Sequence, residues 1–191
     1  TGTLGLAYPN HRSSIEQALV WAQQSDIKTV VDVNWRPAFW PDPALAPDLI
    51  RSLLNRVDIV KLAQQEAEWL FQTGDAAANL QQLEQPQVVI VTAGAAGCSY
   101  AIPAGQAQVP TFAVDCEDTT GAGDAFLAGF IHRLHQLGLE SLTIPHQMYD
   151  SLQFANAVGA LTTLRAGAMV AQPTAKEVEA FLYLQTQQQG L

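Results

Sequence analysis

Short apolar runs rich in β-branched residues alternate with segments of helical spacing through the first half of the chain. The runs occupy residues 29–33, 59–62 and 88–92, and their length and composition are typical of buried strands. Strands that alternate with helices imply a mainly parallel sheet covered by helices on both faces. We therefore predict a single α/β domain over residues 1–191, with ligands bound beyond the carboxyl ends of the strands.

The helices are predicted from apolar spacing and from capping residues. Ser13 and Glu16 have the form of a capping box, which predicts a helix over residues 13–25. Thr174 and Glu177 have the same form in front of the last amphipathic segment. The other predicted helices lie at residues 49–57, 65–71 and 76–83, from about residue 125 onward, and at 152–164.

Two further segments interrupt the alternation. Four prolines between residues 34 and 47 predict a long loop without regular structure. Residues 98–102 and 108–114 have the composition of strands and are predicted to form an antiparallel pair. Beyond this pair, the C-terminal half of the chain is expected to be mainly helical.

The composition excludes several classes of protein. Hydrophobic residues make up 48% of the chain and charged residues 14%, which is too apolar for a disordered chain. Nine Lys and Arg against 18 Asp and Glu give a net charge of −9 with no basic run, so nucleic acid is not an expected partner. No apolar run approaches the ~20 residues that cross a bilayer, so no membrane segment is expected. Cys98 and Cys116 form no CxxC motif, which argues against a zinc site or disulfide framework and favours a cytoplasmic location.

The segment DTTGAGD at residues 118–124 lies between an apparent strand and an amphipathic helix. Small residues at Gly121, Ala122 and Gly123 allow consecutive backbone N–H groups to point at one spot, and the helix adds roughly +0.5 of an elementary charge there. These features predict an anion cradle. A carboxylate beside it repels phosphate unless it has a proton to collect, so we interpret Asp124 as a general base in γ-phosphoryl transfer to an alcohol.

The same segment has a purely structural alternative, in which Gly-Ala-Gly turns a strand into a helix and Asp124 caps that helix. An isolated GxG is more often of this kind. The sequence contains neither a GxxxxGK[ST] motif nor a GxGxxG motif, so a P-loop or a dinucleotide site is not expected.

Four motifs, in chain order, resemble those of the PfkB (ribokinase-like) family of carbohydrate kinases. Residues 118–124 match the family signature DTxGAGD in full, and DVNWR at residues 32–36 is similar to its DxNxR. TAGAAG at residues 92–97 resembles the TxGxxG turn of the nucleotide site. KLAQQE at residues 61–66 resembles the NxxE or SxxE segment, from which Ala63 departs. The resemblance covers nearly the whole chain.

The resemblance implies a ribokinase-like three-layer fold and a role for each motif, with Asp124 as the catalytic base. The other implied site residues are Gly121, Ala122 and Gly123 as the anion hole; Thr92, Gly94, Gly97 and Asn156 at ATP; Asn34 and Arg36 where phosphates and sugar meet; Glu66 at Mg²⁺ through water; and Asp118 and Thr120, with carbonyls near Arg165 and Gly167, at a monovalent cation such as K⁺.

The implied function is an ATP-dependent carbohydrate kinase that phosphorylates a primary hydroxyl of a sugar. Residues 32–40 look most like fructokinases, which makes fructose the leading acceptor, with ketodeoxygluconate, ribose or a nucleoside as alternatives. Family members also carry a Gly-rich sugar signature and a β-sheet lid before this region. Because neither is found here, the resemblance implies that the chain corresponds to the C-terminal nucleotide-binding and catalytic portion, with the N-terminal part and the lid missing.

A different class of function stays open, namely a non-catalytic or truncated kinase-like protein that uses the nucleotide fold for partner binding. A lid sheet upstream, if the protein has one, would present edges that pair between subunits, so a homodimer is a further expectation.

Overall fold

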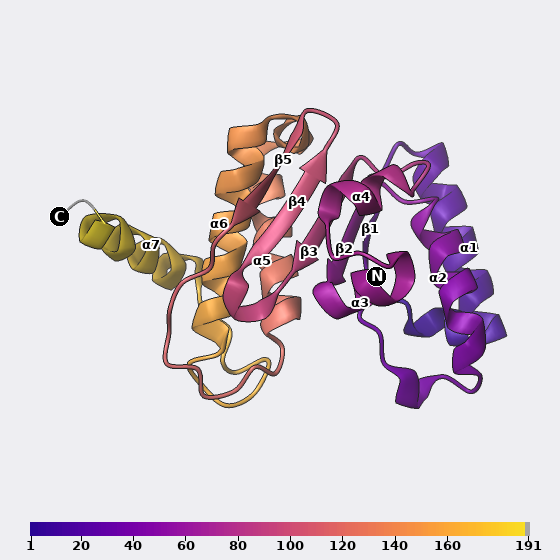
Figure 1. The fold of residues 1–191 in the computed structure, drawn as a ribbon, viewed down its shortest axis with the longest axis horizontal. Coiled ribbons are helices and arrows are strands. Elements are labelled where there is room, and N and C mark those ends of the chain that lie inside the picture. The colour runs from indigo at the N-terminus through magenta and orange to yellow at the C-terminus, as the bar shows by residue number, and fades with distance from the viewer. Residues whose placement is uncertain (190–191) are drawn as a thin grey trace. The chain divides into compact units, whose positions relative to one another are not determined.

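A computed structural model of the chain describes residues 1–189, which divide into two compact units (Figure 1). The first unit contains residues 1–93 and 99–106, and the second contains residues 94–98 and the chain from 107 onward. Each unit is described by itself.

The first unit contains the parallel part of a five-stranded sheet with strand order β1-β2-β3-β4-β5. β1 pairs parallel with β2, and β2 pairs parallel with β3, as the alternation of strands and helices predicts. The strands are β1 (Val30–Asp32), β2 (Ile59–Ala63), β3 (Val88–Thr92), β4 (Cys98–Ile102) and β5 (Gly105–Val109). The helices are α1 (Pro9–Gln24), α2 (Ala46–Leu54), α3 (Gln64–Phe71) and α4 (Ala76–Gln81), with short 3₁₀ turns η1 (Leu4–Ala7), η2 (Pro37–Phe39) and η3 (Pro43–Leu45).

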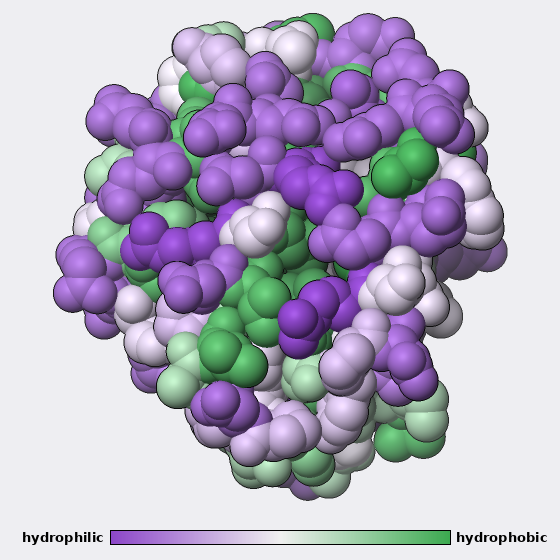
Figure 2. Space-filling model, turned by 90° about the vertical axis from the view of Figure 1, so that its right-hand side faces the viewer, coloured by the Kyte–Doolittle hydropathy of each residue, from purple (hydrophilic) through white to green (hydrophobic). Residues whose placement is uncertain are grey.

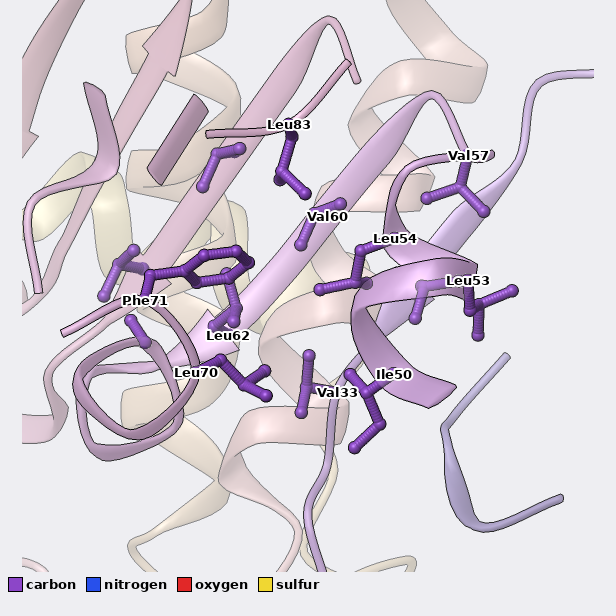
Figure 3. Packing of buried hydrophobic residues seen from close by; sticks show 14 of the residues in the cluster. Val33, Ile50, Leu53, Leu54, Val57, Val60, Leu62, Leu70, Phe71 and Leu83 are labelled. Carbon is purple, nitrogen blue, oxygen red and sulfur yellow. The ribbon is translucent and has the colours of Figure 1, made fainter. Parts of the chain in front are cut away.

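The hydrophobic core of this unit lies between one face of the sheet and its helices. Val31, Val60 and Val89 stand side by side in the register of the three parallel strands, and all three are buried. Because side chains alternate along a strand, the same face also presents Val33 and Leu62. Figure 3 shows this face packed against apolar side chains of α2 and α3, including Ile50, Leu53, Leu54, Leu70 and Phe71.

Proline positions explain where two predictions differ from the structure. The first helix begins at Pro9 rather than Ser13, because a proline in the first helical turn needs no N–H partner. Glu16 does not form the predicted capping box and instead forms an ion pair with Arg56. The proline-rich loop is not wholly irregular, since Pro37 and Pro43 begin η2 and η3.

The predicted hairpin is present with a shifted second strand. β5 covers residues 105–109 instead of the predicted 108–114, and only residues 103–104 separate it from β4. Pro110 has no N–H group to donate to a neighbouring strand, so it cannot continue the ladder. The strands predicted at 59–62 and 88–92 and the helices predicted at 65–71 and 76–83 are confirmed to within two residues.

The second unit is built around two antiparallel helices, α5 (Ala122–Leu137) and α6 (Pro145–Thr162). A Cβ atom added at Gly129 of α5 would lie 2.8 Å from the Val158 side chain of α6, and one at Gly159 would lie 3.3 Å from the Ala122 carbonyl. The two glycines therefore allow the helices to approach closely. The unit also contains η4 (Gly94–Ala96), η5 (Leu139–Thr143) and α7 (Ala175–Gln189).

The last helix begins as its sequence predicts. The Glu177 carboxylate accepts hydrogen bonds from the N–H group and the hydroxyl of Thr174, at 2.7 and 2.8 Å, which completes the predicted capping box. Val178 of α7 is buried with Ala125 and Phe154 in an apolar cluster of this unit.

The outer surface is predominantly polar where Figure 2 displays it, with hydrophobic residues covering a smaller part of that face. Within residues 1–189, none of the helices combines the length and the hydropathy that a bilayer crossing requires.

Candidate functional site

The carboxyl ends of β1, β2 and β3 lie at one edge of the first unit, because these strands run parallel. Asn34 follows β1, Glu66 lies in the first turn of the helix after β2, and Thr92 ends β3. The Thr92 hydroxyl donates a 3.3 Å hydrogen bond to the carbonyl of Leu62. The structure thus gathers four of the predicted site residues at this edge, namely Asn34, Arg36, Glu66 and Thr92.

Glu66 joins two of these loops through its carboxylate. Its Oε1 atom accepts a hydrogen bond from the Trp35 N–H at 2.6 Å, and its Oε2 atom accepts one from the Ala63 N–H at 2.7 Å. Only 8% of Glu66 is exposed. The bond to Ala63 is one half of a capping box; Ala63 has no side-chain oxygen with which to form the other half. Both oxygens of Glu66 are therefore engaged by the backbone.

Asn34 and Arg36 lie on either side of Trp35. Asn34 is half-buried and has a φ angle of +43°, in the left-handed region that few residues other than glycine adopt. Arg36 is exposed, and its Nη1 atom donates to the Trp35 carbonyl at 2.9 Å, which leaves further guanidinium donors for a ligand. The Trp35 ring stacks on Trp69 with 4.5 Å between centroids and lies 5.2 Å from Trp40. Trp35, Trp40 and Trp69 thus pack together.

Sequence reasoning gave no role to the ion pair beneath this edge. The Lys61 ammonium lies 3.1 and 3.0 Å from the two carboxylate oxygens of Asp32, and both residues are only 5% exposed. The two residues are directly opposite each other in the β1–β2 register. A lysine inside the apolar run at residues 59–62 is the signal that could have found it, because a buried charge requires a partner.

In the second unit, Asp118 ties two loops together. Its Oδ1 atom accepts hydrogen bonds from the N–H and hydroxyl of Thr120 at 2.9 and 2.6 Å, and its Oδ2 atom accepts one from the Gly167 N–H at 3.0 Å. The Thr120 hydroxyl, together with the Gly167 and Thr120 N–H groups, lowers the pKa of Asp118 to about 2. Gly121 has a φ of +78°, and a Cβ atom there would lie 2.7 Å from the Cβ of Ala168.

The helix that follows presents free backbone donors beside Asp124. The Ala122 N–H donates to the Thr119 carbonyl at 3.2 Å. Within residues 1–189, no hydrogen bond engages the N–H groups of Gly121, Gly123 or Asp124, and the exposed Asp124 carboxylate has no ion-pair or hydrogen-bond partner. An anion at this helix N-terminus would meet donors from Gly121 and Gly123, which the sequence predicts, and from Asp124 itself.

Asn156 of α6 is a buried polar residue with its amide facing the end of β5. Its Nδ2 atom donates to the carbonyls of Val109 and Pro110 at 3.1 and 3.3 Å, and lies 3.7 Å from the sulfur of Cys98. Only 5% of Asn156 is exposed. Burial raises the pKa of the Cys98 thiol to about 12, so this cysteine stays protonated. Asn156 therefore positions the residue 109–110 segment in the second unit.

Gly94 and Gly97 enclose the short turn η4. Gly97 has a φ of +88°, and a Cβ atom there would collide with the Val109 carbonyl and lie 2.8 Å from the Thr111 nitrogen. Gly97 and Asn156, both predicted at the nucleotide, thus converge on the same backbone segment. Gly94 has a φ of +55°, and nothing lies within 4 Å of the position of a Cβ atom.

Within the described part of the chain, no group of three or more His, Cys, Asp or Glu side chains is arranged to hold a metal ion. Glu66 is buried and each of its oxygens accepts one backbone hydrogen bond, at 2.6 or 2.7 Å. The role at Mg²⁺ through water that the resemblance implies for Glu66 stays a prediction.

Residues 4–175 match the profile of the pfkB family of carbohydrate kinases, which covers most of the chain. The chain belongs to this family. A probable fructokinase-2 from Arabidopsis thaliana is 34% identical to this pfkB-family chain over 193 aligned positions, which cover 97% of the chain and 57% of that protein. The chain therefore spans little more than half the length of this relative.

Solved structures of fructokinases share the fold of the pfkB-family chain. The fructokinase of Vibrio cholerae O395, solved with fructose, ADP and calcium, superposes with a TM-score of 0.86 at 32% identity, covering 95% of the chain and 59% of that protein. The fructokinase of Xylella fastidiosa with bound ATP has a TM-score of 0.89 at 26% identity, covering 97% of the chain and 61% of that protein. The ribokinase-like fold class expected from the motifs is confirmed by this likeness.

Proposed function

We propose that the chain is the nucleotide-binding and base-carrying part of an ATP-dependent carbohydrate kinase, acting in the cytoplasm on the primary hydroxyl of fructose. The observation that carries the proposal is the carboxylate of Asp124, which has no partner among the described residues, beside N–H groups at the start of α5 that are likewise not engaged there. A capping carboxylate would instead accept a hydrogen bond from one of those N–H groups. Membership of the pfkB family and the likeness to fructokinases solved with ADP or ATP support the same reaction.

In this reaction, Asp124 accepts the proton of the sugar hydroxyl as its oxygen bonds to the γ-phosphorus of ATP. The bond between the γ-phosphorus and the β,γ-bridging oxygen breaks, and ADP carries away the electron pair. The N–H groups of Gly121, Gly123 and Asp124 stabilise the charge on the phosphoryl oxygens. Mg²⁺ carried by the ATP phosphates would neutralise part of that charge.

Asn34 and Arg36 are proposed to meet the phosphates and the sugar, because Arg36 has guanidinium donors left over from its bond to the Trp35 carbonyl. Asp118 and Thr120 are proposed to order the loop before α5, and the Asp118 carboxylate is a candidate ligand of K⁺. Thr92, Gly94, Gly97 and Asn156 are proposed to shape the ATP site.

Replacement of the base tests this proposal in the complete enzyme. Asp124→Asn is expected to lower kcat at least ~100-fold, the scale of general-base catalysis, while ATP still binds. Asp115→Asn, an exposed carboxylate shortly before the motif, is the matched control and should keep full activity. An Asp124→Asn enzyme that retained most of its activity would contradict the assignment of the base.

Two alternatives are separated by substrate assays. ATP consumption with fructose, ribose, ketodeoxygluconate and a nucleoside identifies the acceptor. Sugar-independent ATP binding without any turnover in the natural full-length protein would favour the non-catalytic alternative, which the departure of Ala63 from the family motif motivates.

A further inference from the structure

We propose that Glu66 is a positioning residue, which holds the Asn34–Arg36 segment in its ligand-facing conformation through the backbone of Trp35. This inference rests on the proposed function for what Asn34 and Arg36 bind, but the clamp itself is defined by contacts within the first unit. It is independent of the role at Mg²⁺ through water that the resemblance implies for Glu66, because it rests only on the two backbone hydrogen bonds of the carboxylate.

The two hydrogen bonds of Glu66 connect the loop after β1 to the junction of β2 and α3. Both are shorter than the usual 2.9–3.0 Å of an N–H to oxygen bond, at 2.6 Å from Trp35 and 2.7 Å from Ala63. Hydrogen bonds to an ionised acceptor are shorter and stronger than neutral ones, and burial strengthens them further. A carboxylate is suited to this position because it accepts two N–H donors and offers no donor of its own.

The segment being clamped is one that the backbone would not adopt without support. Asn34 lies in the left-handed region with a φ of +43°, although asparagine tolerates this better than most residues. On its N-terminal side, the Val33 N–H donates to the Lys61 carbonyl at 3.0 Å, and the Val33 carbonyl accepts the Thr3 hydroxyl. On its C-terminal side, the bond from Trp35 to Glu66 is the corresponding restraint.

The turn therefore has a fixed point on each side of Asn34. Arg36 depends on the same restraint, because its guanidinium donates to the carbonyl of Trp35, the residue whose N–H group Glu66 holds. A shift of the Trp35 backbone would move both predicted ligand contacts together.

Glu66→Gln is the decisive variant, because it keeps the size of the side chain but leaves a single acceptor oxygen. Ala63 lies three residues away in the same helical turn, so the bond to Ala63 is the easier one to keep. We expect the Trp35 amide to lose its acceptor and to exchange its hydrogen at least tenfold faster, measured by NMR on the purified chain. Glu68→Gln is the matched control, since Glu68 is an exposed neighbour on α3 whose carboxylate accepts a 2.8 Å hydrogen bond from the Gln64 side chain.

The stacked tryptophans provide a second readout that needs no ligand. Because Trp35 and Trp69 stack at 4.5 Å with an interplanar angle of 21°, movement of Trp35 should change the near-ultraviolet circular dichroism of Glu66→Gln but not of Glu68→Gln. If Glu66→Gln does not fold, Glu66→Asp keeps the charge with a shorter reach and should show the same loss at Trp35. Unchanged exchange at Trp35 in the folded variant overturns the inference.

A binding cycle connects the clamp to ligand recognition. Mg·ATP affinity is measured by calorimetry for Glu66→Gln, Arg36→Ala and the double variant. If Glu66 acts through the clamped segment, the loss of affinity in the double variant should be smaller than the sum of the two single losses, and strictly additive losses would contradict this route. A changed Mg²⁺ dependence in Glu66→Gln, with Trp35 exchange unaltered, would instead establish a metal role and refute positioning.

The two proposals fail separately in this design. An Arg36→Ala chain that binds Mg·ATP normally removes Arg36 from the proposed function. In that case, faster exchange at Trp35 in Glu66→Gln still supports the clamp.

Discussion

Asp118 and Gly167 are separated by 49 positions in the sequence, yet the Asp118 carboxylate accepts a 3.0 Å hydrogen bond from the Gly167 N–H. This bond, with two from Thr120, holds the pKa of Asp118 at about 2, below its ordinary 3.8. A carboxyl whose pKa is lower in the folded state stabilises the protein above pH ~4, and the contribution disappears as pH falls toward 2. Asp118→Asn should therefore flatten the loss of stability between pH 4 and pH 2. The midpoint of urea unfolding, measured between pH 4 and pH 2 for the unsubstituted chain and for Asp118→Asn, tests this prediction. The same pH dependence of the midpoint in both proteins would contradict it.

Gly121 is expected to be intolerant of any side chain. Gly121→Ala must place a Cβ atom 2.7 Å from the Cβ of Ala168 at a φ of +78°, so we expect a loss of roughly 2–4 kcal/mol of unfolding free energy. Gly94→Ala is the control: at a φ of +55° with open space around the position, it should cost only ~1–2 kcal/mol. Equal losses in the two variants would show that the contact with Ala168 contributes nothing.

The buried ion pair of Lys61 and Asp32 should be much more sensitive than an exposed one. Lys61→Met leaves the Asp32 charge buried without this partner, and we expect a loss of about 3–5 kcal/mol. Lys28→Met, which removes the partly exposed pair with Asp58, should cost at most ~1 kcal/mol. Chemical denaturation of the two variants at one pH makes the comparison, and similar losses would mean that burial of the first pair is energetically unimportant.

Asn79 is completely buried in α4, and neither atom of its amide has a hydrogen-bond partner within the described chain. An unsatisfied buried amide costs about 1–3 kcal/mol, so Asn79→Leu should raise the unfolding free energy by a similar amount. Asn55→Leu should do the opposite, because the side-chain Oδ1 atom of Asn55 accepts a 3.0 Å hydrogen bond from the Glu84 N–H. Thermal unfolding of the two variants and of the unsubstituted chain tests these opposite changes. A lower melting temperature for Asn79→Leu than for the unsubstituted chain would indicate that the amide has a partner.

The order of strands and helices could be predicted because it depends on local periodicity and on proline chemistry. The strand at residues 88–92 and the cap formed by Thr174 and Glu177 follow directly from residue type and spacing. The start of α1 was misplaced because two signals competed, and Pro9 takes precedence over the apparent capping pair at Ser13. Local patterns do not show which of two valid signals the tertiary packing will use.

The candidate site, like the fold, could be predicted where it depends on local sequence and could not where it depends on long-range contacts. The turn at Gly121 and the start of α5 at Ala122 follow from their small residues, and the roles predicted for Asp124 and its neighbours remain predictions that the proposed variants test. The hydrogen bonds of Glu66 to Trp35 and of Asp118 to Gly167 were not predictable, because each joins residues that are 31 or 49 positions apart. A sequence lists possible acceptors but does not identify which distant N–H group will meet each of them.

The sequence by itself determined the α/β alternation, the parallel pairing that this alternation implies, and the family motifs from Asp32 to Asp124. Only the tertiary structure decided that both oxygens of the Glu66 carboxylate accept backbone hydrogen bonds, that Asn156 faces two carbonyls and a thiol, and that Lys61 is neutralised by Asp32. The physical reason is the same in each case. Burial removes water from a polar group, so its role depends on whichever partner the fold brings within hydrogen-bonding distance.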